Sequence, residues 1–277
     1  MTESAVPQII VANGSLRTAG FRERVLAARE AGFDGFGMHV RDYAQLRTAG
    51  WTDADLRAVL RDNEFNLIEI ETVLGWDDPP ERRDADGVRR ERLAFQLADA
   101  VGARHVVAVG ALTGEPRDTA AEGFAGLCDR AADHGLLVAL EPQACSTITD
   151  LQSAVAIIRT AARPNGGLNL DIWHATRSAW PRAELAALDR DEIVVVQIDD
   201  GPLTPVTDDY LAECTHYRTA PGEGEFDIIG FLSVVYGTGT TAPVSVEVMS
   251  DELDRLPVRT RAERLAMATR RVLSGTS

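Results

Sequence analysis

Eight short apolar runs rich in β-branched residues alternate with amphipathic stretches along this chain, and that alternation limits the fold most strongly. Such alternation indicates parallel strands joined by right-handed helical crossovers. The runs predict strands at 8–12, 35–39, 66–72, 105–110, 136–141, 167–173, 192–199 and 243–249. The stretches between and after them predict helices near 19–31, 53–62, 87–101, 118–134, 149–162, 182–188, 227–236 and 260–273.

Eight strand–helix pairs predict one (β/α)8 TIM barrel over residues 1–277, because this fold typically needs about 250 residues. An open, doubly wound parallel sheet is the alternative, but no GxGxxG motif follows the first strand. Gly32, Gly102 and Gly135 lie between a helix and the next strand, where left-handed helix ends are expected. His105 begins a strand, at the end of a barrel that serves stability, and is expected to be structural.

The composition excludes several function classes. All 28 basic residues are arginine, which rules out a P-loop lysine and a lysine Schiff base. The net charge is −15, so the chain lacks the basic footprint of a nucleic-acid binder. No apolar run approaches the roughly 20 residues of a membrane span. Cys128, Cys145 and Cys214 are widely spaced without a CxxC motif, which argues against disulfides and favours a reducing cytoplasm.

Oxygen-bearing side chains lie at the ends of four consecutive predicted strands. These side chains are Glu141, Asp171, Gln197 followed by Asp199, and Glu247. TIM barrels gather their functional groups at this end, where converging carboxylates repel one another unless a cation is present. The pattern therefore predicts a divalent metal site. Oxygen ligands favour Mn²⁺ or Mg²⁺, with Co²⁺ as a working substitute.

Further residues near these strand ends are candidates for substrate binding. His174 follows the strand-six aspartate by three residues, at the start of a loop or helix. Arg218 lies in the glycine-containing connection 216–227, where its planar guanidinium could clamp a substrate oxygen. His39 ends the second strand, and Trp76 follows the third strand as a wall or lid of the pocket.

Several of these motifs together resemble a known family. Glu141 after LLVAL, the Asp171-x-x-His174 element, RTAPGEGEFD and Glu247 in VSVEV are similar to the xylose-isomerase-like barrels of the sugar phosphate isomerase/epimerase group. The resemblance covers about residues 8–250 and is strongest from 136 to 249. It implies a small sugar or cyclic polyol-derived substrate. It also implies four metal ligands, namely Glu141, Asp171, Gln197 and Glu247.

The resemblance to individual activities within the group is mixed. Most members carry histidine where Gln197 stands, whereas the 3-dehydroshikimate dehydratases also use glutamine. Their arginine-bearing loop after strand three is absent from 71–78, and their carboxylate-binding histidine is absent from 141–150. Thr147 stands where the ketose epimerases carry a second glutamate.

The reaction shared by the group begins with removal of a proton beside a carbonyl. In this chain Glu141 and Glu247 would act as ligand and base, while His174 and Arg218 would stabilise the developing oxyanion. Return of the proton gives an isomerase or epimerase of an α-hydroxy ketone, which is the leading prediction. Loss of a β-hydroxyl instead gives a dehydratase of a dehydroshikimate- or inosose-like ketone. A non-catalytic sugar-binding barrel is the third alternative, and a homo-oligomer is left open.

Overall fold

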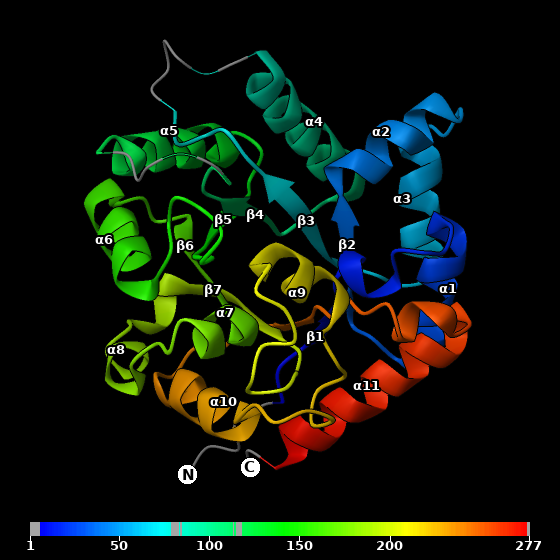
Figure 1. The fold of residues 1–277 in the computed structure, drawn as a ribbon. Coiled ribbons are helices and arrows are strands. Elements are labelled where there is room, and N and C mark those ends of the chain that lie inside the picture. The colour runs from blue at the N-terminus through cyan, green and yellow to red at the C-terminus, as the bar shows by residue number, and fades with distance from the viewer. Residues whose placement is uncertain (1–5, 79–82, 84, 113, 115–117, 276–277) are drawn as a thin grey trace.

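The computed structural model describes residues 6–78, 83, 85–112, 114 and 118–275. Eight parallel strands form a closed barrel in which each strand pairs with its sequence neighbours and β8 pairs with β1 (Figure 1). The predicted (β/α)8 fold is therefore confirmed. The strands are β1 Ile9–Val11, β2 Gly35–His39, β3 Leu67–Val73, β4 His105–Val109, β5 Leu137–Glu141, β6 Gly166–Asp171, β7 Ile193–Ile198 and β8 Val244–Val246.

Helices surround the barrel and cover its outer face (Figure 1). Those that match the expected stretches are α1 Phe21–Ala31, α3 Asp53–Asp62, α4 Ala85–Val101, α5 Ala120–Ala132, α6 Leu151–Ala161, α8 Arg182–Ala186, α10 Ile228–Gly237 and α11 Val258–Ser274. The sequence patterns missed α2 Val40–Thr48, α7 Ile172–Arg177 and α9 Tyr210–His216. Short 3₁₀ segments are η1 Asn13–Leu16, η2 Arg190–Glu192 and η3 Leu253–Arg255.

Alternation along each strand separates an apolar outer face from a polar interior. Alternate strand residues such as Ile68, Ile70 and Leu140 join the main hydrophobic core against the helices. The residues between them point to the opposite face, which is the inside of the barrel. Those inward positions include several buried polar groups, namely Glu69, Glu71, His105, Glu141, Asn169, Asp171, Gln197 and Ser245.

Two predicted strand ends are wrong by two residues or more, and the others agree to within one residue. The sixth strand stops at Asp171 rather than continuing to 173, because the Asp171 carboxylate accepts a hydrogen bond from the Trp173 backbone N–H at 2.8 Å and caps α7. The eighth strand stops at Val246 rather than 249. The expected left-handed glycines are confirmed, and Gly32 ends α1 with φ of 81°.

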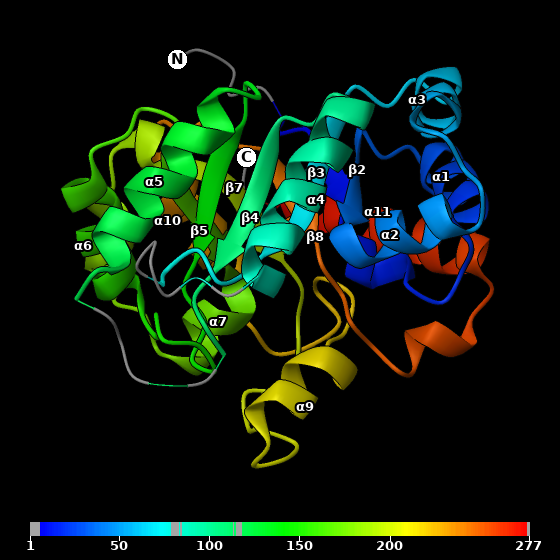
Figure 2. The same ribbon diagram turned by 90° about the horizontal axis from the view of Figure 1, so that it is seen from above.

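A long connection joins β7 to α10 and contains α9; we call residues 199–227 the α9 excursion. Figure 2 shows α9 standing off the barrel on the side where the strands end. Asp200 organises its base, since its carboxylate accepts hydrogen bonds from the backbone N–H groups of Gly222 and Phe226, both at 2.9 Å. A Cβ at Gly224 would lie 2.3 Å from Asp200 Oδ1, so glycine is required there. Within the described ranges, no helix is long and apolar enough to cross a membrane.

Candidate active site at the carboxyl end of the barrel

Three buried side chains converge where β5 and β6 end. Glu141, Asp171 and His174 each offer one ligand atom, and these atoms lie within 4.8 Å of one another. His174 Nε2 is 3.3 Å from Glu141 Oε1 and 3.5 Å from Asp171 Oδ2. The helix cap at Asp171 starts α7 at once, and this places His174 in the first helical turn beside the carboxylate. The arrangement is a compact, buried donor set of the kind that binds a divalent cation.

Arg218 lies among the carboxylates from the neighbouring strands. Its Nη1 donates to Asp171 Oδ2 at 3.0 Å, to the Asp199 carboxylate, and to the backbone oxygen of Glu247 at 3.1 Å. Glu247 Oε2 lies 3.4 Å from the same nitrogen. The Nε group donates to the Cys214 backbone oxygen at 2.7 Å. The guanidinium is 1% exposed, so it serves in this structure as the internal counter-ion of the carboxylates.

The acidic side chains at this end of the barrel outnumber the single positive charge of Arg218, and the pKa values of three of them are raised. Burial raises the pKa of Glu247 to about 8, although Arg218 acts in the opposite direction. Burial also raises the pKa of Asp199 well above its ordinary value. Glu71, at the same end of the barrel on β3, has a pKa raised first by burial and then by Glu247 and Glu69. Burial therefore favours the neutral forms of these carboxyl groups, and a cation bound beside them would favour the ionised forms.

Glu71 ends the third predicted strand beside the site, but the sequence patterns gave it no role; LIEIET alternates and directs Glu69 and Glu71 to one face. Its Oε1 accepts a hydrogen bond from the Asn13 backbone N–H at 2.7 Å. A Cβ at Gly37 would approach that oxygen to 2.5 Å, so β2 needs glycine beside it.

Gln197 lies on β7 directly opposite Asp171 in the strand register. It is 1% exposed, and its Oε1 accepts a hydrogen bond from Asn169 Nδ2 at 2.6 Å. An amide oxygen has a second lone pair, so this bond orients Gln197 without using all its acceptor capacity. In the described part of the chain, the buried Glu141 Oε1 and Asp199 Oδ1 have no hydrogen-bond partner. Such unsatisfied oxygens fit a site that completes its coordination with a cation.

The structure does not bring His39 and Trp76 into this cluster. The His39 ring caps α2, since its Nδ1 accepts a hydrogen bond from the Arg41 backbone N–H at 2.9 Å. Trp76 is fully buried, donates from Nε1 to the Val109 backbone oxygen at 2.8 Å, and packs edge-on against Phe124. Both environments are those of structural side chains.

Tyr210, in the first turn of α9, reaches back to the site. Its hydroxyl lies 2.6 Å from His174 Nδ1, and the two rings are stacked with centroids 5.9 Å apart. The sequence patterns did not identify Tyr210, because no periodicity connects the α9 excursion with α7.

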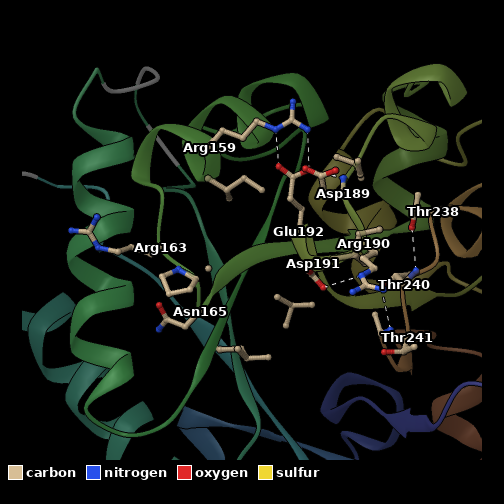
Figure 3. A pocket seen from close by; sticks show the side chains of 18 of the residues that line it. Arg159, Arg163, Asn165, Asp189, Arg190, Asp191, Glu192, Thr238, Thr240 and Thr241 are labelled. Atoms are coloured by element: carbon tan, nitrogen blue, oxygen red, sulfur yellow. Dashed lines mark hydrogen bonds and ion pairs between the residues drawn. The ribbon is translucent and has the colours of Figure 1, made fainter.

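A cleft of about 1320 Å³ lies at the opposite end of the barrel, around the starts of β6 and β7 (Figure 3). Two of its four arginines form close ion pairs with carboxylates: Arg159 with Glu192 at 2.7 Å, and Arg163 with Asp129 at 2.5 Å. The amino-terminal end of a TIM barrel serves stability, so the smaller carboxyl-end cluster remains the candidate site.

Comparison with known proteins agrees with this geometry. The chain matches the family described as xylose isomerase-like TIM barrel over residues 25–273. It is 31% identical over 255 residues to a 3-dehydroshikimate dehydratase of Pseudomonas aeruginosa, covering 87% of this chain but 38% of that protein. It therefore spans about two fifths of that relative. An inosose isomerase of Bacillus velezensis is 24% identical, with 85% of this chain and 89% of that protein covered.

Among solved structures, the IOLI protein with a zinc atom bound has the same fold. The TM-score is 0.87 at 20% identity, and the match covers 98% of this chain and 99% of that one. The family match extends over most of the barrel, from α1 to α11. The chain belongs to the xylose isomerase-like TIM barrel family.

Proposed function

We propose that this protein is a divalent-metal-dependent isomerase or epimerase of a sugar-like α-hydroxy ketone, such as a ketose or a cyclic polyol-derived ketone. The observation that carries the proposal is the convergence of the Glu141 and Asp171 carboxylates, with the His174 ring facing them as a candidate donor to the substrate, beside carboxyl groups whose pKa values are raised. Relatives named as a dehydratase and as an inosose isomerase support chemistry on small oxygenated ketones.

The metal ligands in this proposal are Glu141, Asp171, Gln197 and Glu247. All four offer oxygen, which favours Mn²⁺ or Mg²⁺, and Co²⁺ should substitute. Bound there, the cation would supply Lewis-acid polarisation of the substrate carbonyl and stabilise the enediolate. Asn169 supports the set by holding the Gln197 amide.

This chain's own residues would move the proton. A carboxylate of Glu247 or Glu141 removes the proton on the carbon beside the carbonyl, and the two approach from different strands, β8 and β5. His174 Nε2 faces the same space and can donate to the developing oxyanion. Arg218 holds the carboxylates in place and contributes positive charge beside them. Return of the proton to the other face or the neighbouring carbon completes epimerisation or isomerisation.

Proton exchange in heavy water tests the reaction directly. The metal-loaded protein is incubated in heavy water with a panel of ketoses, inososes and cyclic hydroxy ketones. Proton NMR then follows the loss of the signal from the hydrogen on the carbon beside the carbonyl. We expect exchange with at least one ketone of the panel and none after chelation. Exchange that persists in the metal-free protein would contradict the proposed centre, and binding without exchange would favour the sugar-binding barrel.

The metal assignment has its own test. Elemental analysis followed by chelation and add-back should show activation by Mn²⁺ or Mg²⁺. Gln197→His should shift the preference toward Zn²⁺, Ni²⁺ or Co²⁺, because imidazole nitrogen suits these ions better. An unchanged preference would remove Gln197 from the ligand set in favour of Asp199.

A dehydratase is the second candidate, favoured by the 31% identity to the 3-dehydroshikimate dehydratase. The first step is the same, but a β-hydroxyl then leaves and a new double bond forms. In 3-dehydroshikimate the ring already holds one double bond conjugated with the carbonyl, so the loss of water leads to an aromatic ring that absorbs at longer ultraviolet wavelengths. Appearance of this absorption with 3-dehydroshikimate, at a rate matching exchange, would replace the isomerase proposal with this one.

A further inference from the structure

The ring of His174 has a different kind of neighbour at each nitrogen. Nδ1 lies 2.6 Å from the Tyr210 hydroxyl. Nε2 lies 3.3 Å from Glu141 Oε1 and 3.5 Å from Asp171 Oδ2, and it makes no hydrogen bond within the described residues. A neutral imidazole carries a single proton, so these neighbours decide which nitrogen is a donor and which an acceptor.

Both sides favour a proton on Nε2. The carboxylate oxygens of Glu141 and Asp171 are acceptors, so the nitrogen that faces them is favoured as the donor. On the other side, the Tyr210 hydroxyl makes one hydrogen bond within the described ranges, and its partner is His174 Nδ1. The phenol is satisfied when it donates to Nδ1. Burial and the charge of Asp171 raise the pKa of Tyr210, so the hydroxyl keeps the proton that it donates.

We propose that Tyr210 is a positioning residue that holds His174 as a proton donor at Nε2 and prevents it from ligating the metal. A ligating Nε2 would need its lone pair, and the proton would have to move to Nδ1. The Tyr210 hydroxyl would then have to accept, and its own hydrogen would lose its partner. The inference rests on the proposed function, since it gives His174 the role of donor to a substrate oxygen.

A second buried histidine provides a reference inside the same protein. His105 Nε2 pairs with Glu69 Oε2 at 2.8 Å, and Arg104 Nη1 lies 3.2 Å from His105 Nδ1. Because arginine only donates, His105 Nδ1 must accept and Nε2 must carry the proton. Tyr210 gives His174 the same tautomer, but the Nε2 proton of His174 is left without a hydrogen bond in the described structure. That proton faces Glu141 and Asp171 at 3.3 and 3.5 Å, and a substrate oxygen that enters between them would accept it.

Nitrogen NMR of histidine-labelled, metal-free protein tests the tautomer without any need for activity. His174→Gln identifies the His174 signals, and the His105 signals serve as the reference for a protonated Nε2. We expect His174 to match His105 in the parent protein. Tyr210→Phe should move the His174 signals toward a mixture of tautomers. Tyr236→Phe is the matched control, since it also loses one hydroxyl bond, to the Ala242 backbone oxygen at 2.9 Å.

Titration with Zn²⁺ alone tests the metal part. His174→Gln and Tyr210→Phe should each keep Zn²⁺ affinity within about threefold of the parent, whereas Glu141→Gln should lose more than the roughly 10–100-fold that residues supporting a ligand usually cost. A protonated Nδ1 in the parent, or unchanged His174 signals in Tyr210→Phe, would overturn the inference. Equal losses of affinity in His174→Gln and Glu141→Gln would do the same. Failure of the heavy-water exchange alone would reject the proposed reaction and leave the tautomer result standing.

Discussion

Two groups of buried polar side chains lie inside the barrel, and they differ in how completely they are paired. In the lower group, which lies toward the amino-terminal ends of the strands, the Glu69 carboxylate accepts hydrogen bonds from His105 Nε2 and Ser245 Oγ, each at 2.8 Å. The upper group lies at the carboxyl ends of the strands. Three of its atoms are buried without a hydrogen bond in the described structure: Glu141 Oε1, Asp199 Oδ1 and His174 Nε2.

Glu69 and Glu71 make the contrast sharp, because they are two residues apart on the same face of β3. Glu69 has neutral and basic partners on both oxygens, whereas the pKa of Glu71 is raised by burial and by Glu247. Buried polar groups are normally satisfied, and those that are not require a reason. The reason proposed for the upper group is a cation and a substrate, while the lower group stabilises the barrel. Each prediction below changes one group and leaves the other intact.

The largest effect is expected from Glu247→Gln. This change removes a general base and weakens the metal site, so turnover should fall by roughly 10²–10⁴-fold or more. The fold should remain, because Glu247 follows the last residue of β8 and contributes little to the apolar core. Steady-state kinetics and circular dichroism measure the two outcomes. Glu252→Gln, at an exposed position, is the control, and near-parental activity of a folded Glu247→Gln protein would remove Glu247 from the mechanism.

Substitutions of Arg218 separate charge from shape. Arg218→Ala leaves the buried Asp171 carboxylate without its cation and removes the partner of Asp199 and Glu247, which should destabilise the metal-free protein by about 3–5 kcal/mol and abolish activity. Arg218→Lys restores the charge but not the planar fork that also bonds the Cys214 backbone oxygen. We expect the lysine variant to regain thermal stability without regaining activity. Parental activity in the lysine variant would reduce Arg218 to a simple positive charge.

The lower group should respond in stability alone. His105→Ala leaves the Glu69 carboxylate buried beside Ser245, and the free energy of unfolding should fall by about 3–5 kcal/mol. Substrate KM in the folded protein should not change. Chemical denaturation measures the loss. His134→Ala is the control, because His134 is partly exposed and its pair with Asp99 is worth about 0–1 kcal/mol. A change in KM as large as the change in stability would show that the two groups are coupled.

The sequence predicted the barrel well because its signal is local and repeated. Alternating apolar runs mark each strand, and glycines such as Gly32 mark helix ends. The same alternation at Glu141 and Asp171 predicted that their carboxylates point inward from neighbouring strands, and the structure brings them together.

Contacts between distant segments could not be predicted in this way. Tyr210 meets His174 only because the α9 excursion folds back over the strand ends, and Arg218 lies among carboxylates from three different strands or loops. Trp76 illustrates the opposite case, since its place after a strand suggested a pocket wall, whereas its indole bonds the Val109 backbone in the core. The position of a residue after a strand predicts at which end of the barrel it lies, but it does not predict where its side chain points.

The pH dependence of the metal-free protein tests the protonation of the site by itself. Burial raises the pKa of Glu247 from an ordinary value of 4.5 to about 8, so the folded state holds a proton that the unfolded chain has released. The stability from this proton is complete below pH 4.5 and is lost as the pH rises through about 8, by up to about 1.4 kcal/mol per unit. The shifts of Glu71 and Asp199 have the same sign. Thermal unfolding of chelated protein should therefore show Tm falling from pH 5 to pH 8, with a shallower slope in Glu247→Gln. An equal slope in both proteins would mean that Glu247 is already ionised without the metal, and the contrast between the two groups would then rest on hydrogen bonding alone.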